Sequence, residues 1–124
     1  MEKLTIQEED AMLAVWKTGK GFIKDFMEHF PDPKPPYTTL ASVIKNLERK
    51  GYLKAVRYGN TFEYSTLIDE CEYKRKFMSG FVRDYFKNSY KDLVAFFIEG
   101  QELSREELKE LVNMIEHNAE NSKP

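Results

Sequence analysis

The sequence has one cysteine and two histidines, and this scarcity excludes several kinds of site. Cys71 alone can form neither an internal disulfide nor a metal site built from cysteines. His29 and His117 are isolated and lack cysteine or acidic partners at the spacing of metal ligands. We therefore expect no metal and no other cofactor, and a reduced, cytoplasmic protein.

Long hydrophobic runs and an excess of positive charge are also missing. The longest uninterrupted apolar run, residues 93–98, has six residues, whereas a membrane-spanning helix needs about 20. The chain begins with acidic residues where a signal peptide would have a basic start and an apolar stretch, so we expect neither a membrane segment nor export. With 19 basic and 21 acidic residues, the net charge of −2 excludes a uniformly basic coat for nucleic acid. Any nucleic-acid site must be local.

Signatures of catalysis are absent as well. No glycine-rich phosphate loop and no serine or cysteine triad can be recognised. Cys71 lies between Glu70 and Glu72, whose charges disfavour a reactive thiolate. We therefore expect a protein that is not an enzyme.

The first third of the chain has the spacing of two helices and a stiff connector. Thr5 and Glu8 form a predicted capping box that opens a helix over residues 6–17. Apolar residues at intervals of three and four predict a second short helix within residues 22–30. Residues 31–36 include four prolines, so this segment cannot be helical throughout.

A third helix and a hairpin follow. Thr38 or Thr39 is predicted to cap the helix, and Gly51 to end it in the left-handed conformation. Residues 52–56 and 61–65 are rich in aromatic and β-branched types and flank a glycine–asparagine turn, which predicts an antiparallel hairpin. Three helices followed by a hairpin are the order of a winged helix.

The rest of the chain returns to helical spacing. Three short helices are predicted after residue 67, and Ser104 and Glu107 form a second capping box that opens the last of them. We expect a mainly α protein with a small β-hairpin wing. It would comprise an N-terminal winged helix-turn-helix DNA-binding domain at residues 1–66, a helical dimerisation region at 67–118 and a disordered tail at 119–124.

Positive charge gathers around the third helix. Residues 33–62 hold six basic residues and one acidic residue, a local charge of +5. On a helical wheel, the apolar stripe faces one way and a row of hydroxyl and cationic side chains faces the other. Such a row can meet the acceptors of a DNA major groove, although it could equally be a solvated helix face. Six residues are predicted to address the groove: Thr38, Thr39, Ser42, Lys45, Asn46 and Arg49. Five are predicted to hold the DNA backbone: Lys50, Lys54, Arg57, Tyr58 and Asn60.

The sequence resembles the BlaI/MecI/CopY family of bacterial transcriptional repressors, the penicillinase-repressor type. The resemblance lies in residues 12–17, 39–53, 62–64 and 103–108, and in Leu111, so it extends over nearly the whole chain. It implies a homodimer that binds an inverted-repeat operator in double-stranded DNA through its winged helix and represses transcription.

Three departures from the family pattern bear on function. Family members commonly have arginine at the position of Asn46, so the base contacts and the operator are expected to differ. The cysteine-rich motif of the copper-responsive branch has no counterpart here, so copper sensing is not expected. The Asn–Phe pair that a sensor-dependent protease cuts in the β-lactam-responsive branch aligns with Phe96 and Phe97. Such a protease is therefore a candidate partner, with the cleavage site altered.

Pairing of two copies is also predicted from the residues after Thr66. Three short helices are too few to bury their own aromatic and aliphatic side chains, and a second copy is the simplest cover. The alternative is that these helices fold back on their own winged domain. The predicted dimer interface comprises Phe77, Phe81, Tyr85, Phe96, Phe97, Leu108, Leu111, Val112 and Ile115.

Two other functions compete with repression. A winged helix can serve as a protein-interaction adaptor that does not bind DNA, in which case the basic row is incidental. A weaker alternative is a regulator that binds a ligand between its C-terminal helices.

Overall fold

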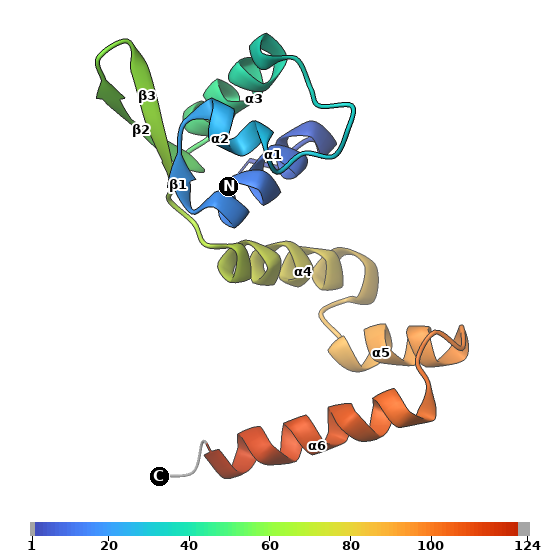
Figure 1. Ribbon diagram of the computed structural model, residues 1–124. Coiled ribbons are helices and arrows are strands. Elements are labelled where there is room, and N and C mark those ends of the chain that lie inside the picture. Colours follow the sequence, from blue (N-terminus) through green and yellow to red (C-terminus); the bar gives the residue numbers. More distant parts are fainter. Residues whose placement is uncertain (1, 122–124) are drawn as a thin grey trace. The chain divides into compact units, whose positions relative to one another are not determined.

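The computed structural model describes residues 2–121 (Figure 1). Within these residues the chain forms two compact units, residues 2–75 and 76–121. The division falls within helix α4 (Glu70–Phe86), later than the domain boundary predicted after residue 66. The physical reason is that the start of α4 packs on the first unit, where Tyr73 contacts the hydrophobic core.

Helix α1 (Ile6–Thr18) begins at the predicted capping box. The Glu8 amide donates to the Thr5 hydroxyl over 3.2 Å, and the Thr5 amide donates to Glu8 Oε1 over 2.8 Å. These two bonds satisfy backbone donors that have no partner inside the helix.

The second helix is shorter than its apolar pattern predicts. Helix α2 (Ile23–Met27) is preceded by the two-residue strand β1 (Lys20–Gly21) and ends three residues before Phe30. Pro31 disfavours a helical conformation at Phe30, so the apolar spacing continues through turns rather than through helix.

Helix α3 (Tyr37–Arg49) begins directly after the proline connector. Pro36 is its N-cap residue and Thr38 and Thr39 lie inside the first turn, so the predicted threonine cap is wrong. The helix ends in a Schellman motif with Gly51 at φ +87°, as the glycine predicted. The amides of Gly51 and Tyr52 donate to the carbonyls of Glu48 and Leu47, over 3.0 and 2.9 Å.

The hairpin lies in a three-stranded antiparallel sheet with the order β1-β3-β2. Strands β2 (Leu53–Tyr58) and β3 (Thr61–Thr66) pair in register, Leu53 with Thr66 and Tyr58 with Thr61, around a two-residue turn. Gly59 supplies the positive φ of +60° that this turn needs. The sequence analysis missed β1, because two residues are too few to show a strand pattern.

Helices α1, α2 and α3 and the β2–β3 hairpin form a winged helix-turn-helix (Figure 1), which confirms the predicted fold class. Phe26, Met12 and Ile44 are fully buried at its centre. The segment that follows the hairpin is joined to α1 by the Trp16 indole, whose Nε1 donates to the Ile68 carbonyl over 3.0 Å. The burial of Ile44 among the core residues of α1 and α2 holds α3 in place.

The second unit consists of the rest of α4, α5 (Tyr90–Glu99) and α6 (Arg105–Asn121). The second capping box is confirmed, with hydrogen bonds of 3.0 and 3.1 Å between Ser104 and Glu107. Helix α6 continues to Asn121 because neither glycine nor proline interrupts it, so residues 119–121 are helical rather than disordered. Residues 122–124 of the predicted tail lie outside the described residues.

Candidate nucleic-acid interface

Helix α3 separates its side chains into a buried face and an exposed face. Leu40, Ile44 and Leu47 are at most 2% exposed and join the core of the first unit. All six residues predicted to address a groove are exposed: Thr38, Thr39, Ser42, Lys45, Asn46 and Arg49. The structure therefore brings these residues together on the outer surface of one helix.

The exposed face of α3 carries cationic and donor groups that are not engaged elsewhere. Within the described part of the chain, the side chains of Lys45 and Arg49 form no hydrogen bond or ion pair. No side chain caps the amino end of α3, because its N-cap residue is Pro36. The amides of the first turn and the positive end of the helix dipole therefore remain available to an anion such as a phosphate.

The wing supplies further exposed groups beside α3. Lys54, Arg57, Tyr58 and Asn60 are all exposed. Arg57 lies at the tip of the hairpin, where its Nε donates to the Gly59 carbonyl over 2.9 Å. This bond holds the guanidinium near the turn and leaves its terminal nitrogens at the surface, which is a suitable arrangement for contact with a phosphate.

Lys50 has a different role from the one predicted for it. Its ammonium lies 2.6 Å from Glu8 Oε1, and its side chain is only 11% exposed. Burial by itself would raise the pKa of Glu8, but hydrogen bonds from Lys50 and Thr5 outweigh burial and hold that pKa below its usual 4.5. Because the ammonium is occupied in this pair, we remove Lys50 from the DNA-contacting set.

The helical spacing of the sequence already indicates that Lys50 lies on the buried side of α3. At 100° per residue, Lys50 lies about 280° around the wheel from Leu40. That position is beside Val43 on the buried face, far from Arg49 on the exposed face.

A groove of about 560 Å³ lies between α3 and the wing. Two residues that were predicted to contact DNA line this groove, Lys45 from α3 and Asn60 from the wing. Lys24, Tyr37 and Phe62 line it too, and the sequence analysis did not select them. The position of Tyr37, directly after the proline run and at the start of α3, could have indicated that its side chain lies at this groove.

Residues 2–121 contain neither a cluster of metal-ligating side chains nor a helix that could span a membrane. No group of three or more histidine, cysteine or acidic side chains among them could hold a metal ion. Over the same residues, no helix is both long enough and apolar enough to cross a bilayer.

In the second unit, most residues predicted to pair two copies are at the surface. Phe77, Tyr85, Phe96, Leu111, Val112 and Ile115 are between 40% and 74% exposed. Phe81, Phe97 and Leu108 are half-buried. The Phe86 ring contacts Phe81 and Phe96, with centroids 5.9 and 5.8 Å apart, so an aromatic cluster connects α4 and α5. Phe96 and Phe97 lie within helix α5, and cleavage between them stays a prediction.

Comparison with known families settles the relationship suggested by these features. The sequence model of the penicillinase repressor family matches residues 4–117. The chain belongs to the penicillinase repressor family. This result confirms the resemblance to the BlaI/MecI/CopY repressors.

Two relatives of this penicillinase repressor family protein are named regulators. The methicillin resistance regulatory protein MecI of Staphylococcus aureus is 30% identical over 77 residues, which are 62% of this chain and 63% of that protein. The penicillinase repressor of Bacillus licheniformis is 28% identical over 85 residues, 68% of this chain and 66% of that protein. The chain thus matches slightly less than two thirds of the length of MecI. Among solved structures, a mutant of Lactococcus lactis ZitR aligns at a TM-score of 0.43 with 15% identity, covering 98% of this chain and 77% of that one.

Proposed function

We propose that the chain represses transcription by binding, as a homodimer, to an inverted-repeat operator in double-stranded DNA. The observation that carries the proposal is the division of α3 into a core-packed face and an exposed face of hydroxyl, amide and cationic groups. A DNA major groove admits one such helix and presents acceptors that lysine and arginine can meet. Membership of the penicillinase repressor family supports the same function.

The exposed residues divide into two roles. Those on α3 face the base edges and nearby phosphates, and they are Thr38, Thr39, Ser42, Lys45, Asn46 and Arg49. Those on the wing contact the sugar–phosphate backbone, and they are Lys54, Arg57, Tyr58 and Asn60. Lys24 and Tyr37, at the groove between α3 and the wing, are additional candidates for phosphate contact.

Dimerisation is supported by how little the second unit buries. Of the hydrophobic side chains described from residue 76 onward, only those of Val82 and Leu93 are buried. A unit this small with so few buried side chains has little stability of its own. A second copy can cover the exposed apolar residues of α4, α5 and α6. A two-fold dimer would place two α3 helices about 34 Å apart or at a multiple of that distance, matching half-sites on one face of the duplex.

In this proposal, the protein represses transcription by occupying promoter DNA. A dimer bound across promoter DNA would exclude RNA polymerase, and no catalytic step is required. The operator is expected among palindromic segments upstream of the protein's own gene and its neighbours.

Fluorescence anisotropy with labelled duplexes tests the proposal. The probes are a palindromic upstream duplex and a random-sequence duplex, each titrated over a range of salt concentrations. Lys45→Ala/Arg49→Ala should weaken binding to both duplexes, and the salt slope should fall by about 0.9 for each phosphate that the variant no longer neutralises. Lys91→Ala/Lys109→Ala removes the same charge from exposed positions in the second unit and is the matched control.

Two results would contradict the proposal. Binding that is unchanged in the α3 double variant would remove α3 from the interface. An absence of salt-sensitive binding to either duplex by the unmodified protein would instead favour the protein-interaction adaptor. Circular dichroism of each variant shows whether its helices are retained.

A further inference from the structure

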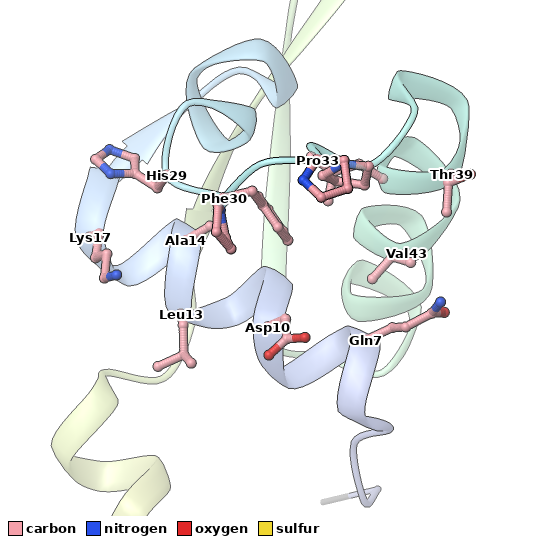
Figure 2. Close-up of a pocket in the computed structure, with 13 residues that line it drawn as sticks. Gln7, Asp10, Leu13, Ala14, Lys17, His29, Phe30, Pro33, Thr39 and Val43 are labelled. Carbon is pink, nitrogen blue, oxygen red and sulfur yellow. The ribbon is translucent and has the colours of Figure 1, made fainter.

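A second cavity, of about 400 Å³, lies on the first unit away from the wing (Figure 2). It is formed by α1, the segment that follows α2, the proline connector and the start of α3. Its walls are mainly apolar, with Leu13 and Ala14 from α1, Phe30 and Pro33 from the connector side, and Val43 from α3. A volume of this size is within the roughly 300–1,000 Å³ of small-molecule sites.

Several apolar side chains of the cavity walls are open to solvent. Leu13 is 42% exposed, although Ala14 beside it is 2% exposed. Phe30 is half-buried, and Pro31 and Pro33 are exposed next to it. Aromatic and proline rings that line a concave surface form a suitable surface for a flat apolar group.

The polar and charged side chains of the cavity are arranged unevenly. Lys17 and His29 lie toward one end in Figure 2, whereas Gln7 and Thr39 lie toward the other. Asp10 is two helical turns before Lys17 on α1, so their backbone positions are about 10 Å apart along the helix axis. Within residues 2–121, the side chains of Lys17 and His29 form no hydrogen bond or ion pair.

We propose that this cavity binds a small aryl or alkyl carboxylate. The apolar part of the ligand lies against Leu13, Phe30 and Pro33, and its carboxylate is at the end that Lys17 and His29 line. Asp10 disfavours the reverse orientation of the ligand, because the Asp10 carboxylate would repel a ligand carboxylate placed beside it. Lys17 is flexible and exposed, so it can approach the ligand without a change in the backbone.

This site goes beyond the proposed function and does not rest on it. Thr39 lines the cavity and also belongs to the proposed DNA-contacting set, whereas Lys45, Arg49 and every residue of the wing lie outside the lining. Ligand binding can therefore be measured on the full chain without DNA, and failure of the DNA-binding proposal would leave the result unaffected.

NMR titration of the full chain with 4-phenylbutyrate tests the proposal. The neutral 4-phenylbutanol and the cationic 4-phenylbutylamine share the same apolar body and serve as matched ligands. We expect saturable shifts of the amides of Leu13, Phe30 and Val43. The carboxylate should bind roughly 2- to 5-fold more tightly than the alcohol, as expected for an exposed ion pair, and the amine should bind most weakly.

Two pairs of variants separate the charged end from the apolar walls. Lys17→Gln should abolish the preference for the carboxylate and leave the affinity for the alcohol unchanged, whereas Lys3→Gln should alter neither. Leu13→Ala should weaken all three ligands, whereas Leu67→Ala, at a leucine that is 56% exposed outside the cavity, should weaken none.

Three results would overturn the proposal. The first is an absence of saturable shifts at the three amides up to the solubility of 4-phenylbutyrate. The second is equal affinity for the three ligands in the unmodified protein, which needs no variant to measure. The third is a carboxylate preference that survives Lys17→Gln.

Discussion

The Lys50 ammonium lies 2.6 Å from Glu8 Oε1, which joins the end of α3 to the beginning of α1. Both side chains are nearly buried, at 11% and 5% exposed. The same ammonium donates to the Lys3 carbonyl over 3.1 Å, and the Tyr52 hydroxyl donates to the Glu2 carbonyl over 2.6 Å. A basic residue at the end of α3 thus holds α1 and α3 together.

Lys50→Met should destabilise the first unit. Removing one partner leaves the Glu8 carboxylate buried without its ion pair, which costs about 3 kcal/mol of the free energy of unfolding. Urea unfolding followed by the fluorescence of Trp16, the one tryptophan, measures this loss. Lys45→Met, at an exposed position of the same helix, is the matched control and should change the free energy of unfolding by less than about 0.5 kcal/mol. Equal stability of the two variants would contradict this role of Lys50.

Stability should also depend on pH through Glu8. Its pKa is below 4.5 in the folded protein, so the folded state favours the ionised carboxylate. The contribution of Glu8 is therefore fully present above pH 4.5 and is lost as the pH falls through the lower folded-state pKa. Glu8→Gln cannot ionise, so its deficit in unfolding free energy relative to the unmodified protein should shrink on acidification. A deficit that is constant from neutral pH down to about pH 3 would show that ionisation of Glu8 does not contribute.

Local signals in the sequence predicted much of the first unit correctly. The Thr5–Glu8 box, the apolar stripe of α3 and Gly51 each depend on residues close together in the chain. Their hydrogen bonds and spacing are set by the geometry of a single helix, so sequence spacing is enough to infer them.

Features that require distant segments to meet were not predictable in this way. Lys50 and Glu8 are 42 positions apart, and their ion pair exists only once α1 and α3 have packed. Strand β1 forms because β3 offers Tyr64 and Ser65 as pairing partners, not because of its own two residues. The groove and the cavity likewise depend on how helices and connector assemble.

Val112→Asp/Ile115→Asp should turn the proposed dimer into a monomer. Both residues are exposed on α6, at 51% and 68%, and a buried carboxylate without a partner would strongly disfavour an interface. Light scattering coupled to size exclusion measures the mass directly. Lys109→Asp/Asn113→Asp, at polar exposed positions of the same helix, is the control and should remain dimeric. A dimer that persists in the Val112 and Ile115 variant would place the interface elsewhere.

Asn46 should contribute to the choice of operator rather than to general affinity for DNA. Its amide is exposed on α3 between Lys45 and Leu47, and an uncharged side chain releases no counterions when it contacts DNA. An asparagine that forms two hydrogen bonds to adenine discriminates against the wrong base by about 1–3 kcal/mol. Asn46→Ala should therefore weaken binding to the operator and leave both the affinity for a random duplex and the salt slope unchanged. Asn46→Arg should instead raise affinity for random DNA and change the base preferred at one position of each half-site. Competition binding against a set of single-base operator variants measures that change, and an identical base preference in all three proteins would show that Asn46 does not face the bases.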